Sequence, residues 1–258
     1  MQGKTVVITG ATSGIGEVAA IHLAEQGARI VFTARDKKRA DATMAKLRRA
    51  NGESQHQVHF GDLSLIAEQK RVAAALAAEP RIDVLINNAG AIFTHRTETR
   101  EGLEKTFALN HMSYFTITNL LLPRLKETRG ARIVSVASGA HRRGHMNFND
   151  LQSRQAYRAF PVYGTTKLCN ILFTRALAKR LVGSGVTANC LHPGFVATRF
   201  ADQAGGLLQR VVKFIKPFSG LSPEEGAKTI LYLAAASEVA DVSGEYFYQC
   251  RVDQPTQD

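Results

Sequence analysis

Cysteine is scarce in this sequence, and long apolar runs are missing. The 258 residues include 3 cysteines, which are far apart and form no C-x-x-C pattern. This usage fits a reducing compartment and argues against a disulfide framework or a zinc site. No apolar run approaches the roughly 18 residues of a membrane-spanning helix. Because an apolar strand at 6–8 follows Met1 almost at once, we also expect no signal peptide. These absences predict a cytoplasmic protein without a transmembrane segment.

The sequence also lacks linkers and nucleic-acid motifs. No stretch is rich in Pro, Gly or Ser, and 45% of the residues are hydrophobic, so we predict one domain over 1–258. The formal net charge of +11 would suit a nucleic acid or an anionic membrane, but the basic residues are dispersed and lie beside no aromatic platform. His141 and His145 have the spacing of a metal-binding pair, but the arginines between them disfavour a cation. We predict neither a nucleic-acid partner nor a metal site.

Strands and helices alternate along the whole chain. Helical segments separate apolar, strand-like stretches at 5–9, 29–33, 58–60, 82–86, 133–136, 186–191 and 246–248. This alternation predicts an α/β fold, a Rossmann-type doubly wound parallel sheet of about seven strands with helices on both faces. We expect Ser64 to cap the helix after the third strand. Asn110 falls inside a long helical stretch where Asn is unfavourable, which suggests a local bonding role.

The first strand leads into a glycine-rich turn, Thr9 to Gly16, that opens a helix. Binding of phosphate at such a turn needs backbone amides at a helix N-terminus and no side chain in the way. Gly10, Gly14 and Gly16 meet both conditions, although their spacing differs from G-x-G-x-x-G and a tight turn alone can also explain glycines.

The end of the second strand bears on the choice of cofactor. At this place a dinucleotide-binding fold uses an acidic residue for NAD or an arginine for the 2′-phosphate of NADP. Here Arg35 comes first, Asp36 follows, and further basic residues lie behind them. The order favours NADP(H) over NAD(H), while a solvated basic helix start is the plainer alternative.

Tyr163 and Lys167 open an apolar-patterned helix and stand one turn apart on one face. A fixed cation within about 4–6 Å favours the phenolate and lowers the pKa of the tyrosine. We therefore expect Tyr163 to exchange a proton with an alcohol. A surface i,i+4 pair is the alternative, because this pattern occurs often by chance.

Together these motifs resemble the short-chain dehydrogenase/reductase family over essentially the full chain. The match consists of the glycine turn, Asn87-Asn88-Ala89-Gly90, Ser138, Tyr163-x-x-x-Lys167 and Pro193-Gly194 in this order. The resemblance implies an oxidoreductase with the catalytic set Asn110, Ser138, Tyr163 and Lys167. It implies cofactor contacts from Gly10, Thr12, Ser13, Gly14, Ile15, Gly16, Arg35, Asp62, Leu63, Asn88, Ala89, Gly90, Tyr163, Lys167, Pro193, Gly194, Val196 and Thr198.

Several short motifs resemble those of the retinol-dehydrogenase-like branch of this family. They are Ala34-Arg35-Asp36, the long connection between Ser138 and Tyr163, and His192-Pro193-Gly194. That branch prefers NADP(H) and lipophilic alcohols, aldehydes or ketones. We expect a homodimer or homotetramer formed through the Tyr163 helix. We also expect a substrate lid over 199–221 with possible peripheral membrane contact, although a core helix would explain its apolar residues too. A nucleotide-sensing regulator or scaffold with this fold is the alternative function.

Overall fold

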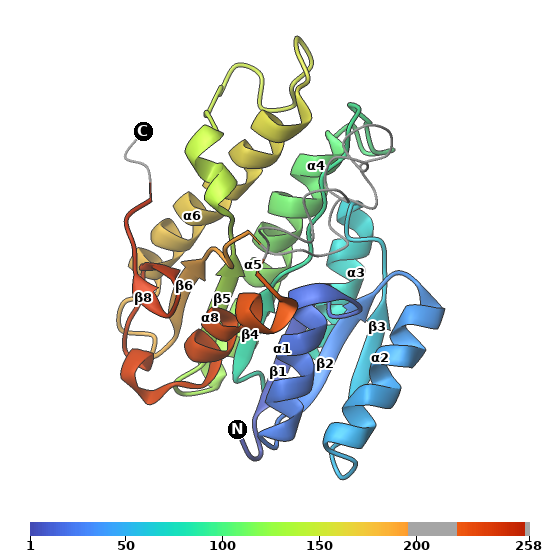
Figure 1. Ribbon diagram of the computed structural model, residues 1–258, viewed down its shortest axis with the longest axis vertical. Helices are drawn as coiled ribbons and strands as arrows, with labels where there is room; N and C mark the ends of the chain where they lie inside the picture. Colours follow the sequence, from blue (N-terminus) through green and yellow to red (C-terminus); the bar gives the residue numbers. More distant parts are fainter. Residues whose placement is uncertain (196–220, 256–258) are drawn as a thin grey trace.

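The structure is a computed structural model that describes residues 1–195 and 221–255. Its centre is one sheet with the strand order β3-β2-β1-β4-β5-β6-β7-β8 (Figure 1). Neighbouring strands run parallel except β8, which is antiparallel to β7. The strands are β1 (Thr5–Thr9), β2 (Arg29–Ala34), β3 (Gln57–Phe60), β4 (Val84–Asn87), β5 (Arg132–Val136), β6 (Thr187–Leu191), β7 (Tyr246–Tyr248) and β8 (Arg251–Val252). The predicted fold class is confirmed.

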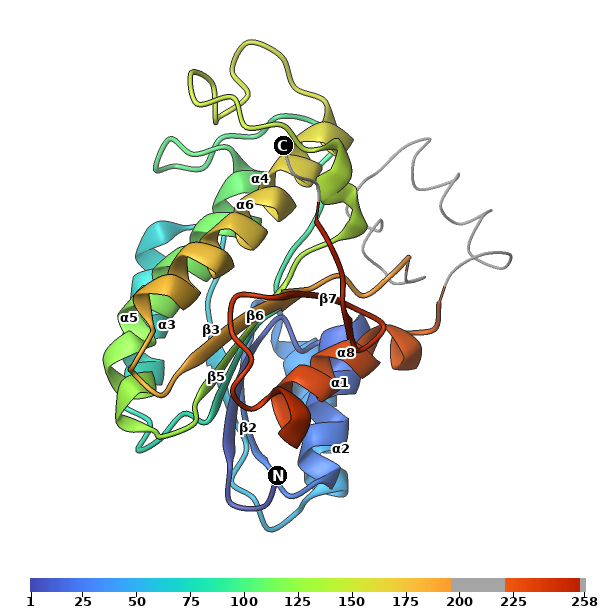
Figure 2. The same cartoon turned by 90° about the vertical axis from the view of Figure 1, so that its left-hand side faces the viewer.

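Helices cover both faces of the sheet (Figure 2). One layer contains α1 (Gly14–Glu25), α2 (Lys37–Ala50) and α8 (Pro223–Ala235), and the other contains α3 (Ile66–Ala77), α5 (Ser113–Glu127) and α6 (Ala159–Arg180). Short helical pieces complete the described chain: α4 (Lys105–Phe107), the π-helical η1 (Ala108–Met112), and the 3₁₀ turns η2 (Gly139–Arg143) and η4 (Ser237–Val239).

The central strands are buried on both sides, which explains their continuous apolar runs. Along β1, Val6 and Ile8 pack into the cluster that contains α1 and α8, while Val7 packs into the cluster that contains α3, α5 and α6. Because β1 to β7 run parallel, their carboxyl ends lie at one edge of the sheet. The strand order reverses between β1 and β4, and open α/β sheets bind ligands at the crevice that forms there.

Two details of the sequence-based expectation were wrong. Ser64 does not cap α3, because its hydroxyl donates to Asp62 Oδ1 (2.8 Å). The amides of Ile66 and Ala67 at the start of α3 instead donate to the carboxylate of Glu101, 35 and 34 residues away. The strand β8 was not expected, because residues 249 and 250 of its turn have positive φ (47° and 61°) without being glycine.

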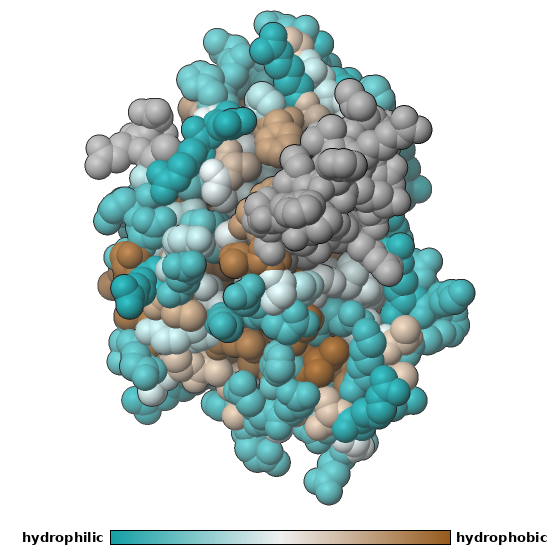
Figure 3. Space-filling view, in the orientation of Figure 1, coloured by the Kyte–Doolittle hydropathy of each residue, from teal (hydrophilic) through white to brown (hydrophobic). Residues whose placement is uncertain are grey.

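The described helices include none long and apolar enough to cross a membrane. On the side of the molecule shown in Figure 3, the surface is largely hydrophilic, and apolar residues form a few separate groups. The positive charge predicted to be dispersed is spread over several elements, and many basic side chains are paired, such as Arg29 with Glu79 and Lys46 with Glu17.

Candidate active site

The glycine turn after β1 has the geometry that a diphosphate requires. Gly10 (φ +71°) and Gly14 (φ +59°) adopt left-handed conformations that favour glycine. A Cβ on Gly16 would lie 2.3 Å from Asn88 Nδ2 and 2.6 Å from Gly10 O, so no side chain fits there. Ser13, the N-cap of α1, makes no side-chain capping hydrogen bond. The first-turn amides of α1 therefore remain available to an anion, and the turn fits a dinucleotide.

The turn after β4 is bonded to this glycine turn. Asn88 Nδ2 donates to Thr9 O (2.9 Å) and Gly10 O (3.0 Å), while Thr9 Oγ1 accepts from the amides of Asn88 (2.9 Å) and Ala89 (3.0 Å). The side chain of Asn88 thus has a structural task between the strands β1 and β4. The amides of Asn88 and Ala89 are engaged in the same way, and the ribose contact that the resemblance implied for 88–90 stays a prediction.

The predicted adenosine-binding residues lie at the ends of two paired strands, β2 and β3. Arg35 is exposed directly after β2. The carboxylate of Asp36 accepts from Arg39 N (2.8 Å) and caps α2. Asp62 bonds Ser64, and Leu63 is buried. Asp36 is therefore already engaged by its own helix, whereas Arg35 is exposed to solvent.

The predicted catalytic pair, Tyr163 and Lys167, lies on α6 and faces the carboxyl end of β5. Tyr163 is buried, and its hydroxyl is hydrogen-bonded to Ser138. Lys167 Nζ lies 5.7 Å from the centre of the Tyr163 ring and donates to Val136 O (2.9 Å). Ser138 is also the N-cap of η2, where its Oγ accepts from Ala140 N (3.2 Å). The structure thus brings Ser138, Tyr163 and Lys167 together.

The structure contradicts the expected lowering of the Tyr163 pKa. Burial raises the pKa of Tyr163 to about 12, and the hydrogen bond with Ser138 only partly opposes it. The same burial lowers the pKa of Lys167 to about 7. Desolvation disfavours both charged forms, so it outweighs the attraction between phenolate and ammonium on which the sequence argument relied. At neutral pH Tyr163 holds its proton and can serve as an acid.

Asn110 stands in the π-helical turn η1, which interrupts the helical stretch between α4 and α5. Its side chain accepts from Ala91 N (2.9 Å) and donates to Ala91 O (2.8 Å) and Thr166 Oγ1 (3.2 Å). Its backbone oxygen accepts from Asn170 Nδ2 (2.9 Å). The local bonding role expected for Asn110 is present, because the wider π turn frees a carbonyl that α6 then satisfies.

Gly90 lies beside this group. A Cβ on Gly90 would lie 3.2 Å from Asn110 Oδ1 and 3.4 Å from Lys167 Nζ. The four predicted catalytic residues and the turn after β4 therefore share one compact region. Sequence reasoning missed Thr166, which links Asn110 to the backbone oxygen of Tyr163 (2.7 Å), and Tyr114, whose ring centre lies 5.4 Å from Lys167 Nζ. Thr166 stands three residues after Tyr163, and that spacing was the available signal.

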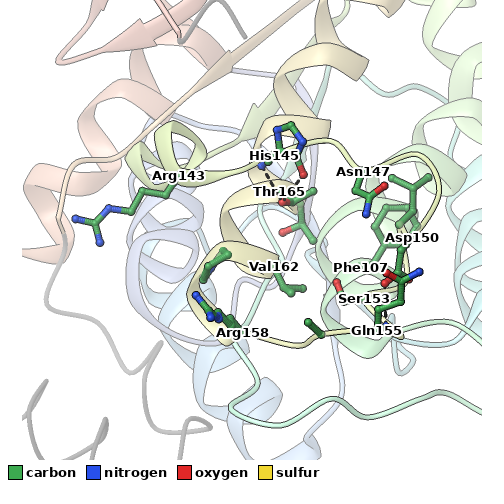
Figure 4. A pocket seen from close by; sticks show the side chains of 14 residues that line it. Phe107, Arg143, His145, Asn147, Asp150, Ser153, Gln155, Arg158, Val162 and Thr165 are labelled. Carbon is green, nitrogen blue, oxygen red and sulfur yellow. Dashed lines mark hydrogen bonds between the residues drawn. The ribbon is translucent and has the colours of Figure 1, made fainter.

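The long connection 144–158 folds over the start of α6. A cavity of about 250 Å³ lies beneath it, with Phe107, Asn147, Val162 and Thr165 among its walls (Figure 4). Thr165 Oγ1 donates to His145 O (3.1 Å) and accepts from His145 N (3.2 Å). None of Ser138, Tyr163 and Lys167 lines this cavity, although Thr166 does, so the cavity lies beside the predicted catalytic group.

Pro193 and Gly194 follow β6 at the same edge of the sheet. Gly194 has φ +81°, and its absent Cβ leaves room for Leu221, whose Cδ1 would lie 2.5 Å away. Val196, Thr198 and the predicted lid up to residue 220 lie outside the described residues. Their predicted roles, and the membrane contact expected for the lid, stay predictions.

Comparisons with known proteins agree with this arrangement. A family model described as short chain dehydrogenase matches residues 4–205. Human retinol dehydrogenase 14 is 41% identical over 275 residues, which cover 98% of this chain and 80% of that protein. These matches include every predicted catalytic residue and reach well beyond the glycine turn.

Solved structures are similar as well. An uncharacterized protein from Mycobacterium paratuberculosis is 34% identical with a TM-score of 0.75, covering 95% of this chain and 80% of that one. A short-chain dehydrogenase from Sphingobium yanoikuyae in complex with NADPH is 28% identical with a TM-score of 0.71, covering 88% and 82%. The chain belongs to the short-chain dehydrogenase/reductase family, in its retinol-dehydrogenase-like branch, and is an oxidoreductase that interconverts alcohols and carbonyl compounds.

Proposed function

We propose that this protein is an NADP(H)-dependent reductase of lipophilic aldehydes and ketones, including retinoid-like compounds, with Tyr163 as the proton donor. The observation that carries the proposal is the buried, protonated Tyr163 hydroxyl hydrogen-bonded to Ser138 beside Lys167. The nicotinamide supplies the hydride when the cofactor is bound. Similarity to human retinol dehydrogenase 14 supports the lipophilic substrate class.

Each residue of the group has a distinct task. Ser138 Oγ orients the substrate oxygen, and Tyr163 gives that oxygen its proton as the carbonyl is reduced. Lys167, with a pKa of about 7, can change its charge near neutrality and so stabilises the phenolate that forms when Tyr163 releases its proton. Asn110 holds the turn 90–91 against η1 through its two bonds to Ala91. In the alcohol-oxidising direction the same groups act in reverse.

Replacing Tyr163 by Phe tests this mechanism. Tyr163→Phe keeps the ring but removes the proton donor, so turnover should fall by about 10²–10⁴-fold while NADPH binding persists. The measurement is NADPH oxidation at 340 nm with a panel of hydrophobic aldehydes and ketones. Tyr232→Phe is the matched control, because it removes a tyrosine hydroxyl from α8, on the opposite face of the sheet from α6. Unchanged turnover in Tyr163→Phe would refute the mechanism. Tight NADPH binding by the wild type without turnover of any carbonyl would favour the regulator or scaffold.

The cofactor preference is proposed to depend on Arg35. An arginine can hold a phosphate through paired hydrogen bonds, and Arg35 is exposed at the end of β2. Asp36 is the acidic residue that would favour NAD, but its carboxylate already accepts a hydrogen bond from the Arg39 amide. Residues 10–16 would hold the diphosphate, Asp62 and Leu63 the adenine, and 88–90 the neighbouring ribose.

Arg35→Ala tests that preference. Loss of a charge-assisted phosphate contact should raise the Kd for NADPH by about tenfold or more, because such bonds contribute about 1.5–3 kcal/mol. The Kd for NADH should change little. Arg49→Ala, at the far end of α2, removes the same charge away from the cofactor and serves as the control. Equal changes for both cofactors, or a wild type that prefers NADH, would contradict the assignment.

We propose that the chain forms one domain. We also propose that two copies of this chain pair through their helices α5 and α6. These helices lie side by side, with the rings of Phe115 and Phe173 5.6 Å apart (Figure 2). Phe115 and Leu172 are each 43% exposed, and exposed apolar side chains on neighbouring helices are candidates for a protein contact. The three free cysteines are consistent with a reducing compartment such as the cytoplasm.

A further inference from the structure

His192 lies where three segments of the active-site edge meet. Its ring stacks on Tyr248, with centroids 4.0 Å apart and planes 11° apart, and its centroid lies 5.6 Å from that of Tyr246. A Cβ on Gly139, the residue after Ser138, would lie 3.8 Å from His192 Nδ1. The imidazole is therefore held between β7 and the first residue of η2, at the end of β6.

The polar atoms of His192 support the turn that follows. The amide of Gly194 donates to His192 Nδ1 (3.2 Å), across a proline that has no amide of its own. The backbone of His192 donates to Phe247 O (3.0 Å), and Phe195 O accepts from Leu221 N (2.7 Å). Gly194 stands in a left-handed conformation (φ +81°), and because glycine can adopt many backbone conformations, its hydrogen bond to His192 helps to select this one.

The bond requires an unprotonated Nδ1. The pKa of His192 is lowered to about 4, chiefly by burial; the charge of Asp253 opposes this lowering, and His141 and Arg142 add to it. Asp253 Oδ2 is 3.9 Å from His192 Nε2, which is too far for a hydrogen bond. The ring is thus neutral at pH 7 and free to accept at Nδ1.

We propose that His192 is a positioning residue, whose Nδ1 accepts the Gly194 amide and holds the Pro193–Gly194 turn in the shape that receives the nicotinamide end of the cofactor. The proposal rests on the nicotinamide cofactor of the proposed function. It differs from a packing role, because it assigns the effect to one acceptor atom and not to the stacked ring.

Two substitutions separate the acceptor from the ring. His192→Phe keeps the stacking on Tyr248 and removes the acceptor, whereas His192→Asn places an amide oxygen near the position of Nδ1 and removes the stack. Tyr248→Leu is the matched control, since it weakens the stack and leaves the hydrogen bond. For each protein we would measure the Kd for NADPH by fluorescence, the thermal midpoint without cofactor, and amide exchange of Gly194 by NMR.

The proposal predicts a dissociation between affinity and stability. His192→Phe should raise the Kd for NADPH by about tenfold with a thermal midpoint near that of the wild type, while His192→Asn stays within about threefold despite a lower midpoint. An unchanged Kd in His192→Phe, or losses of affinity that follow the thermal midpoint across all variants, would overturn it.

Amide exchange keeps the test independent of cofactor binding. Without cofactor, the Gly194 amide should be protected in the wild type and in His192→Asn, and should exchange faster in His192→Phe. Equal exchange in all three would overturn the role of Nδ1. Failure of the wild type to bind NADPH would instead count against the proposed function, while the exchange data would still decide the role of His192.

Discussion

At the scale of single residues, the buried ammonium of Lys167 makes the stability of this protein depend on pH. Burial lowers the pKa of Lys167 from 10.5 to about 7, so the unfolded chain binds an extra proton between these values. The burial of Lys167 therefore costs no stability above about pH 10.5, and the free energy of unfolding decreases as pH falls from there toward about 7. The active site thus carries a cost that an isosteric apolar residue would remove.

Lys167→Met should therefore stabilise the protein relative to the wild type, and by more at pH 7 than at pH 9.5. The lost bond to Val136 O lowers stability at both pH values, so the difference between them isolates the titration. Urea denaturation at the two pH values measures it, and Lys228→Met, at an exposed position of α8, should show no such difference. A constant gap between Lys167→Met and the wild type would mean that Lys167 titrates normally.

At the scale of elements, α4 and η1 present Asn110 to the site because Glu104 holds their start. Glu104 is fully buried, and its carboxylate accepts from the amides of Thr106 (2.8 Å) and Phe107 (2.7 Å). The amide of Glu104 donates to Gln152 Oε1 (2.7 Å), which attaches this start to the connection 144–158. The orientation of η1 therefore depends on a capping residue six positions before Asn110.

Glu104→Ala should lower the free energy of unfolding by about 1–3 kcal/mol, because two amides lose their acceptor in the interior. Glu104→Gln keeps one acceptor oxygen and should lose less. Glu98→Ala, which removes an exposed ion pair with Arg96, should cost at most about 1 kcal/mol. Urea denaturation compares the three variants. A Glu104→Ala protein as stable as Glu98→Ala would rule out the capping role.

At the scale of the whole molecule, the exposed apolar side chains on α5 and α6 should decide the assembly state. Phe115→Asp or Leu172→Asp would bury a charge in the proposed interface and should convert a dimer or tetramer into smaller species. Val182→Asp, at a residue 84% exposed beyond the end of α6, should leave the assembly unchanged. Light scattering with size-exclusion chromatography measures the masses. A monomeric wild type would contradict the pairing.

The net charge of +11 acts at the same scale. Anionic nicotinamide cofactors meet a positive field on approach, and such fields raise association rates without fixing affinity. The charge is weak support for nucleic-acid binding, because many of the basic side chains in the described residues already form ion pairs with acidic ones. The net charge therefore affects how fast an anionic cofactor associates, while the residues of the site determine which ligand binds.

Features that depend on neighbours along the chain could be predicted from sequence. Alternating apolar segments implied the parallel sheet, the glycines of 10–16 implied an open helix N-terminus, and the spacing of Tyr163 and Lys167 implied one helical face. The capping box of Ser222 and Glu225 at the start of α8 is another local feature, since its two residues are three positions apart in sequence. Each depends on local periodicity or backbone sterics, which a short stretch of sequence contains.

Features that depend on distant partners were decided by the tertiary structure. The pKa of Tyr163 rises because residues far apart in sequence exclude water from it, and desolvation has no local signature. Asp36 and Glu101 are both acidic residues near helix starts, yet one caps its own helix and the other caps α3 from more than 30 residues away. The π turn at Asn110 and the acceptor role of His192 likewise need bonding partners that only folding brings near. Sequence therefore determined which groups are available for chemistry, and packing determined their charge, orientation and partners.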